Sequence, residues 1–218
     1  MRTTTLSFPA RERPATHLAV LLHGVGDNAD GFQGIAQALA PRFPRVDFLV
    51  ADGFHAWDGG GRGRQWYSMQ SVTEESRKAR VREARLEVSP WLDDELTARG
   101  LTGEKLVLIG FSQGAILSAS LALHRTPGPA AVVMMSGRVA ELDAPGPTRV
   151  PTPFFVAHGT SDGVIPVSAV KPSVETLEAW GAPVTSRVYP GLAHAVSAEE
   201  LGDVTAFLAG ALGRNAAP

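Results

Sequence analysis

Short runs of apolar and β-branched residues recur along the chain, each bounded by Gly, Pro or Asp. The strands they predict span residues 17–24, 45–52, 105–111, 130–137, 153–159 and 184–191. Segments with helical character alternate with them, at residues 29–41, 73–98, 112–124, 167–181 and 197–212. Apolar strands that alternate with helices predict an α/β fold, with a mostly parallel central sheet and helices on both faces. A chain of 218 residues fits around one core, so we expect a single domain over residues 1–218.

Charge and composition exclude several classes of protein. The formal net charge is −2 at pH 7 and the basic residues are scattered, which is not the pattern of a nucleic-acid-binding protein. A chain without cysteine forms neither disulfides nor thiolate-ligated metal sites. The start of the chain has no apolar signal region, and no stretch approaches the roughly 18 apolar residues of a membrane span. We therefore expect a cytoplasmic location and no stable membrane insertion, although the lack of cysteine also suits an oxidising compartment.

The longest predicted helix covers residues 73–98. Ser71 and Glu74 have the spacing of a capping box at its start, and Pro90 predicts a kink or a break into two helices. An apolar stripe that we expect to face the sheet consists of Val81, Ala84, Val88, Leu92 and Leu96.

The pentapeptide Gly110-Phe111-Ser112-Gln113-Gly114 matches the pattern G-x-S-x-G. It follows the apolar run KLVLI and opens the helical run QGAILSASLAL. This strand, turn and helix setting is typical of a nucleophile elbow, where a strained turn raises the serine hydroxyl above the end of the sheet. The pattern alone is common by chance, but its flanks favour Ser112 as a nucleophile.

A serine hydroxyl needs a base to remove its proton, so a histidine and a carboxylate must follow Ser112 along the chain. Three histidines do so: His124, His158 and His194. His124 ends the helix that the elbow opens, and we assign it to interaction with the helix C-terminus.

Order along the chain decides between the other two histidines. Asp162 and His194 both lie in loops that follow strands, where catalytic groups of open α/β sheets gather. A base at His158 would need Glu141 or Asp143 as its acid, in a loop rich in Pro and Gly. We therefore predict Asp162 as the acid and His194 as the base, and assign His158 to holding its loop.

Acyl transfer places negative charge on a former carbonyl oxygen, which preorganised N–H groups must meet. The elbow supplies one such donor, the backbone N–H of Gln113. The loop LLHGVGDNADGF supplies the second, and we predict Val25, with Gly24 and Gly26 allowing close approach of the backbone. His23 is assigned a structural role.

The same loop satisfies a dinucleotide-binding pattern, G-x-G-x-x-A over residues 24–29, and Asp52 follows at the end of the next strand. Asp27 argues against this interpretation, because it would put a carboxylate where the pyrophosphate should bind. The interpretation also explains nothing after residue 52.

One long segment, residues 53–72, does not fit the alternation of strands and helices. It is rich in Gly and carries Trp57 and Trp66. Loops of this length inside a compact domain are more often functional than accidental. We predict that it lies over the active site and that Trp66 lines the acyl pocket. The alternative is that Trp66 packs the loop onto the core, and Trp57 is the weaker candidate for the pocket.

These motifs together resemble the carboxylesterase/phospholipase family of α/β-hydrolases, which includes small bacterial carboxylesterases and acyl-protein thioesterases. LLHGVGDN resembles its oxyanion loop, GFSQGA its elbow, HGTSDGVIP its acid loop and YPGLAHAVSAEE its histidine loop. The resemblance implies an α/β-hydrolase fold without a large cap domain. The roles it implies are Ser112, Asp162 and His194 as nucleophile, acid and base, with Val25 and Gln113 as oxyanion donors. Ala115 departs from the second glycine that many members have after the elbow.

The expected function is hydrolysis of short- to medium-chain acyl esters by a serine carboxylesterase, through an acyl-enzyme and without a cofactor or metal. Two alternatives stay open. The same triad could act on acyl thioesters or lysophospholipids, or the protein could be a non-catalytic hydrolase-fold protein used for binding. The expected partner is a small-molecule acyl ester, and a homodimer is compatible with these features.

Overall fold

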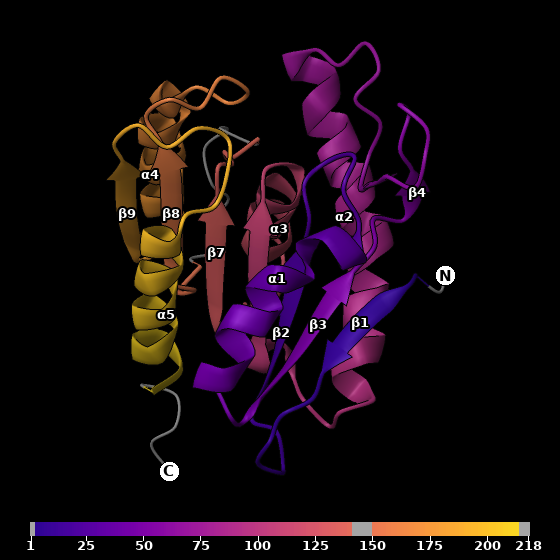
Figure 1. Ribbon diagram of the computed structural model, residues 1–218, viewed down its shortest axis with the longest axis vertical. Coiled ribbons are helices and arrows are strands. Elements are labelled where there is room, and N and C mark those ends of the chain that lie inside the picture. The colour runs from indigo at the N-terminus through magenta and orange to yellow at the C-terminus, as the bar shows by residue number, and fades with distance from the viewer. Residues whose placement is uncertain (1–2, 141–149, 214–218) are drawn as a thin grey trace.

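The computed structural model describes residues 3–140 and 150–213. Within this part of the chain, seven strands form one sheet in the order β1-β3-β2-β6-β7-β8-β9 (Figure 1). They are β1 (Thr5–Phe8), β2 (His17–Leu22), β3 (Val46–Ala51), β6 (Leu106–Phe111), β7 (Ala131–Met135), β8 (Phe154–Gly159) and β9 (Val184–Tyr189). Every neighbouring pair is parallel except β1 and β3. The expected mostly parallel sheet is confirmed.

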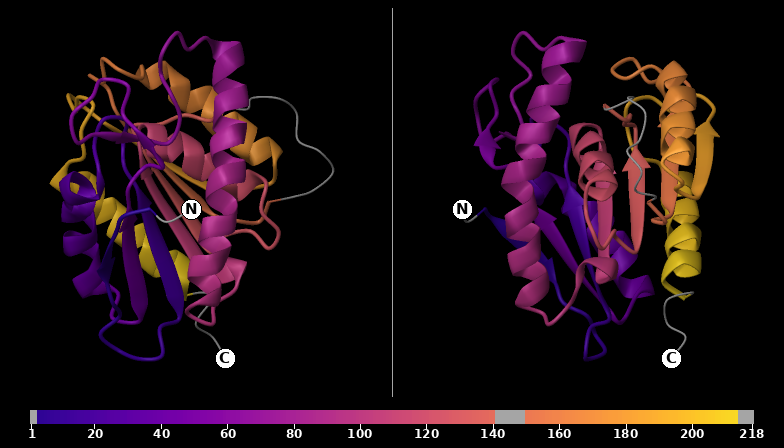
Figure 2. Two further views of the ribbon diagram at one scale, coloured as in Figure 1. Left: turned by 90° about the vertical axis from the view of Figure 1, so that its right-hand side faces the viewer. Right: turned by 180° about the vertical axis from the view of Figure 1, so that it is seen from behind.

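Helices cover both faces of this sheet. They are α1 (Ala29–Leu39), α2 (Glu74–Thr97), α3 (Gln113–Leu123), α4 (Val170–Ala179) and α5 (Ala198–Gly213). Short 3₁₀ turns are η1 (Ala40–Arg42), η2 (Gly103–Lys105) and η3 (Val167–Ala169). Figures 1 and 2 show α1 and α5 on one face and α2, α3 and α4 on the other. Among the described residues, no helix is both long enough and apolar enough to cross a membrane.

The core lies on both faces of the sheet because the central strands are buried on both. In β2, Leu18 and Val20 pack on the side of α2 and α3, whereas Ala19 and Leu21 pack on the side of α1 and α5. Successive side chains of a strand point to opposite faces, so a strand covered on both must be apolar throughout. This explains why the strands stand out in the sequence as continuous apolar runs.

The start and the middle of α2 differ from the prediction. Its capping box is made by Thr73 and Ser76: the Thr73 hydroxyl accepts from the Ser76 N–H at 3.2 Å, and the Ser76 hydroxyl accepts from the Thr73 N–H at 2.8 Å. The box predicted for Ser71 and Glu74 is therefore wrong. A break at Pro90 is also wrong, because the helix continues through it. The buried stripe is as predicted and also includes Trp91, and its packing in the core stabilises the helix on both sides of Pro90.

The segment between β3 and α2 contains a short hairpin of β4 (His55–Ala56) and β5 (Arg64–Gln65). This hairpin pairs with the loop that follows β2. The Gly26 N–H donates to the Arg64 carbonyl at 2.8 Å, and the Arg64 N–H donates to the Asp27 carbonyl at 2.7 Å. The long Gly-rich segment is therefore anchored beside the first loop of the sheet.

The first turn of α3 lies directly against the end of β2. A Cβ added to Gly114 would overlap the Leu22 carbonyl oxygen, and one added to Gly110 would overlap the Gly114 carbonyl oxygen. Every side chain of α3 is buried. The two glycines of the G-x-S-x-G motif are therefore required for the helix to pack this closely on the sheet.

We expect Gly114→Ala to destabilise the fold by roughly 1–3 kcal/mol or more, because the added methyl group must displace the backbone of β2. Thermal unfolding measures the effect. Gly202→Ala in α5 is the matched control, since a Cβ there meets no atom within 4 Å. Alanine favours helix over glycine, so the control should unfold at the same or a slightly higher temperature. Equal melting temperatures for wild type and Gly114→Ala would contradict the packing argument.

Candidate active site

Ser112 occupies a strained turn between β6 and α3. Its φ of 52° and ψ of −115° lie in a region that serine rarely adopts, and it is the N-cap of α3. The turn is held on both sides, because the Ser112 N–H donates to the Met135 carbonyl at 2.9 Å and its carbonyl accepts from the Ile116 N–H at 3.1 Å. Only 6% of the residue is exposed. The geometry is that of a nucleophile elbow.

Asp162 and His194 lie in contact in the loops that follow β8 and β9. The His194 Nδ1 donates to the Asp162 Oδ2 at 2.7 Å. The other carboxylate oxygen accepts from the N–H groups of Val164 and Ile165, at 2.8 and 2.9 Å. Burial acts to raise the pKa of Asp162, but the hydrogen bonds from His194 and the two amides hold that pKa below its usual range. The carboxylate is therefore ionised at neutral pH and fixes the imidazole through Nδ1.

The imidazole of His194 lies beside the elbow. Its ring centroid is 4.8 Å from that of Phe111, the residue before Ser112. The loop that carries it is tied to the acid loop, because the Ser161 N–H donates to the Leu192 carbonyl at 2.9 Å. The structure thus gathers the three residues that the sequence selected at the carboxyl end of the sheet.

His158 is buried behind this pair. Its Nε2 donates to the Ile165 carbonyl at 2.8 Å and lies 3.3 Å from the Asp162 Oδ2. These contacts hold the acid loop in shape, which is the role assigned to His158 from sequence. The competing acids for a base at His158, Glu141 and Asp143, lie outside the described residues.

The loop after β2 comes into contact with the elbow. A Cβ added to Gly24 would lie 3.4 Å from the Ser112 Cβ. The N–H of Val25, the next residue, has no hydrogen-bond partner in residues 3–140 and 150–213. The Gln113 N–H is the first of α3, one of the amides that a helix leaves without an internal partner. Both predicted oxyanion donors therefore lie in the backbone segments that flank Ser112.

His23 fixes the shape of this loop. Its Nδ1 donates to the Gly24 carbonyl at 2.6 Å, and its Nε2 accepts from the Gly53 N–H at 2.8 Å. Burial lowers the pKa of His23, despite the hydrogen bond to Gly24, so the ring is neutral in one tautomer. This agrees with a structural role.

The N-terminus of α1 is already capped by the chain's own side chains. The Asp52 carboxylate accepts from the Ala29 N–H at 2.7 Å, and the Asn28 side chain accepts from the Gly31 N–H at 3.0 Å. A dinucleotide pyrophosphate would need these same amides. The geometry therefore argues against the dinucleotide interpretation of residues 24–29.

Trp66 lies in the core and not on an open surface. It is 1% exposed, its Nε1 donates to the His23 carbonyl at 2.9 Å, and its backbone N–H donates to the Gln113 Oε1 at 2.9 Å. The Gln113 side chain also donates to the Tyr67 carbonyl at 2.8 Å. Trp66 thus joins the oxyanion loop to the elbow, and this placement favours the alternative in which it packs the loop onto the core.

Trp57 is the more exposed tryptophan of the 53–72 segment, at 39%. Its indole covers Gly26, where an added Cβ would lie 3.2 Å from the ring. The sequence predicted Trp66 as the stronger pocket candidate, but it could not show that the hairpin buries Trp66 and leaves Trp57 partly exposed.

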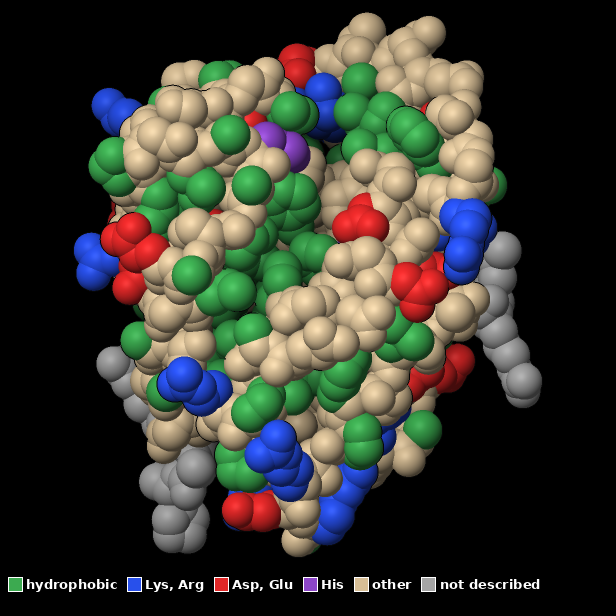
Figure 3. Space-filling view, viewed as in Figure 1, with side chains coloured by type: hydrophobic (Ala, Val, Ile, Leu, Met, Phe, Trp, Pro, Cys, Tyr) green, Lys and Arg blue, Asp and Glu red, His purple; other side chains and the backbone are tan. Residues whose placement is uncertain are grey.

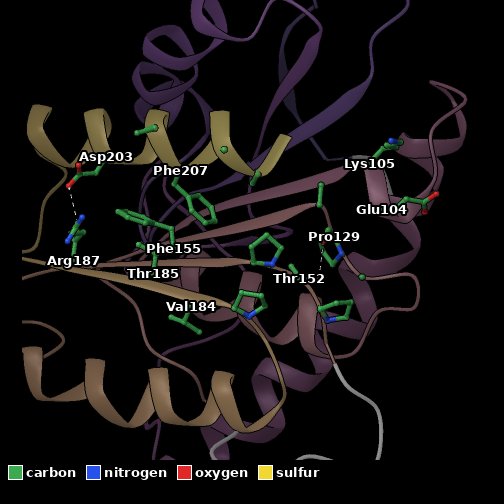
Figure 4. A pocket seen from close by; sticks show the side chains of 18 residues that line it. Glu104, Lys105, Pro129, Thr152, Phe155, Val184, Thr185, Arg187, Asp203 and Phe207 are labelled. Atoms are coloured by element: carbon green, nitrogen blue, oxygen red, sulfur yellow. Dashed lines mark hydrogen bonds and ion pairs between the residues drawn. The ribbon is translucent and has the colours of Figure 1, made fainter. Parts of the chain in front are cut away.

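A cavity of about 750 Å³ lies at the opposite end of the sheet (Figure 4). Its lining includes Lys105 and Val184, at the start of β6 and β9, together with Phe155 and Phe207. Ser112 lies at the carboxyl end of β6, so this cavity has no part in the site described above.

Comparisons with known proteins agree with this geometry. A model of the phospholipase/carboxylesterase family matches residues 6–212. The esterase YpfH of Escherichia coli is 34% identical over 85% of this chain and 78% of its own, and acyl-protein thioesterase 1 of Gibberella zeae is 25% identical over 95% of each chain. The crystal structure of esterase PE8 superposes with a TM-score of 0.88 at 25% identity, over 95% of this chain and 98% of that one. The chain belongs to the phospholipase/carboxylesterase family of α/β-hydrolases.

Proposed function

We propose that this serine hydrolase is a carboxylesterase that hydrolyses short- to medium-chain acyl esters, with Ser112, Asp162 and His194 as its catalytic triad. The observation that carries the proposal is the 2.7 Å bond between His194 and the ionised Asp162, beside the strained serine of the elbow. This arrangement supplies a nucleophile, a base and the group that orients the base.

The first half of the proposed reaction forms an acyl-enzyme. The Ser112 Oγ bonds to the ester carbonyl carbon while its proton passes to His194 Nε2. The N–H groups of Val25 and Gln113 stabilise the oxyanion that forms. The intermediate collapses when the carbon–oxygen bond to the alcohol breaks, and His194 returns its proton to the leaving oxygen.

The second half is hydrolysis of the acyl-enzyme. Water attacks the acyl carbon, His194 takes its proton, and the same proton returns to the Ser112 Oγ as the carboxylic acid leaves. Asp162 holds the imidazole in the tautomer with its proton on Nδ1 and stabilises the imidazolium in both halves.

Hydrolysis of acyl thioesters is a second candidate function. It is supported by the similarity to acyl-protein thioesterase 1 over nearly the whole chain. The same residues would act in the same order, with a thiol in place of the alcohol. Comparing kcat/KM for an oxygen ester and a thioester of the same acyl group separates the two candidates.

We expect Ser112→Ala to lower kcat by about 10⁴-fold or more and to abolish labelling by a fluorophosphonate probe. Ser136→Ala is the matched control, since Ser136 is a buried serine of similar backbone geometry, φ 48°, just after the neighbouring β7. The control should label at the wild-type rate. Labelling of Ser112→Ala at that rate would show that another residue is the nucleophile.

We expect Asp162→Asn to lower kcat by about 10⁴-fold, because the amide would favour the wrong tautomer of His194. Asp203→Asn serves as control: Asp203 accepts a hydrogen bond from the Tyr189 hydroxyl at 2.9 Å and lines the cavity at the far end of the sheet. Steady-state kinetics on an aryl ester measures both. The acid is misassigned if the Asp203 variant loses activity and the Asp162 variant keeps it.

Trp66→Phe removes the hydrogen bond from the indole to the His23 carbonyl, which helps to hold the loop after β2 against the elbow. A bond of this kind contributes about 0.5–1.5 kcal/mol, so we expect kcat to fall by roughly two- to tenfold. The loss should be equal for acetyl and octanoyl esters. Trp180→Phe is the control, because Trp180 Nε1 has no hydrogen-bond partner among the described residues. A loss that grows with acyl length would instead place Trp66 in the acyl pocket.

A further inference from the structure

A groove of about 350 Å³ opens beside His194, between α1 and α5. Figure 3 shows hydrophobic side chains gathered in the hollow between these helices. Its apolar walls are formed by Phe32 and Ile35 of α1, Phe111 of the elbow, and Val196 and Leu201 on the side of α5.

The groove reaches His194, the base of the proposed triad. His194 lines it, as does Phe111, the residue before Ser112, and the rings of these two residues are in contact. Phe32 continues the floor, with its ring centroid 6.4 Å from that of Phe111. A chain bound at the imidazole could therefore extend along an unbroken apolar surface.

We propose that this groove binds the alcohol part of the ester substrate and sets its size, an inference that rests on the proposed function. The base that accepts the Ser112 proton must return it to the leaving oxygen, so the substituent on that oxygen extends away from the imidazole of His194. The groove begins at that imidazole and continues along the residues after it, Ala195 and Val196.

The charge of the lining selects among alcohols. Asp27 is the one carboxylate in the groove's lining, and no Lys or Arg of the described residues joins it there. A phosphate or carboxylate on the leaving group would meet Asp27 without a cation to balance it. The groove therefore suits neutral alkyl alcohols better than the phosphate-bearing leaving group of a lysophospholipid.

Gly34 offers a way to fill the groove without disturbing the core. It lines the groove, and a Cβ added there meets no atom within 4 Å. Gly34→Leu puts a bulky side chain at the groove wall, and Gly34→Ala a small one. Gly202→Leu makes the same change at a glycine of α5 that is equally open and outside the lining. Thermal unfolding checks that all three variants are folded.

The assay compares two isomeric esters. Hexyl acetate carries its long alkyl chain on the alcohol arm of the ester, and methyl heptanoate carries it on the acyl arm. We expect Gly34→Leu to lower the ratio of kcat/KM for hexyl acetate to that for methyl heptanoate by at least about tenfold. Burial of one methylene group changes kcat/KM by roughly fourfold, so excluding a few methylene groups of the hexyl chain from the groove is sufficient. Gly34→Ala should lower the ratio less, and Gly202→Leu should leave it unchanged.

Other results would overturn the proposal. A ratio that rises in Gly34→Leu would mean that the groove takes the acyl arm, and an unchanged ratio would mean that it takes neither arm. Failure of the esterase function itself looks different, since the wild type would then hydrolyse neither ester and would not label with the fluorophosphonate probe.

A second pair of esters tests the charge argument. For the wild type, kcat/KM should be at least about tenfold lower for 4-acetoxybutanoate than for butyl acetate. In Asp27→Asn the difference between the two values should be smaller. Equal rates on the two esters in the wild type would show that Asp27 does not select against anionic leaving groups.

Discussion

The reactive end of the molecule depends on the close contact between the first turn of α3 and the end of β2. Gly114 lies against the carbonyl oxygens of Leu22 and His23, a distance that leaves no room for a side chain. Because the helix starts so near to this strand, the elbow lies against the loop after β2, where a Cβ added to Gly24 would lie 3.4 Å from the Ser112 Cβ. One steric condition thus brings together the strained serine and the loop after β2, the two segments that carry the donors of the proposed oxyanion hole.

Buried polar pairs then fix the loops that this contact brings together. The indole of Trp66 donates to the His23 carbonyl, and the Gln113 side chain bonds the backbone of Trp66 and Tyr67. His158 holds the loop that carries Asp162 through its hydrogen bond to the Ile165 carbonyl. A buried polar group without a partner is costly, so each bond resists movement of the segment it holds. The loops around Ser112 and Asp162 are thus held in place by side chains outside the proposed triad.

The sequence predicts the elements with long, distinctive patterns and misses those with weak ones. The apolar runs and the order of motifs were enough to select Asp162 and His194, which the fold brings to 2.7 Å. The antiparallel strand β1 was missed because it is four residues long and mostly half-exposed at the sheet edge, which leaves no continuous apolar run. The environment of Trp66 could not be predicted, because its partner Gln113 lies far along the chain and acts through a side-chain amide.

The order of the strands in the sheet has a consequence for synthesis of the protein. The central strand β2 pairs with β3, made soon after it, and with β6, made much later, while β8 and β9 are added at one edge as the chain nears its end. Distant pairings of this kind close long loops and form late in folding. In the proposed mechanism Ser112 needs His194, which emerges from the ribosome long after it, so an incomplete chain would lack the base. On this mechanism, turnover requires that β9 and the loop after it have docked on the rest of the sheet.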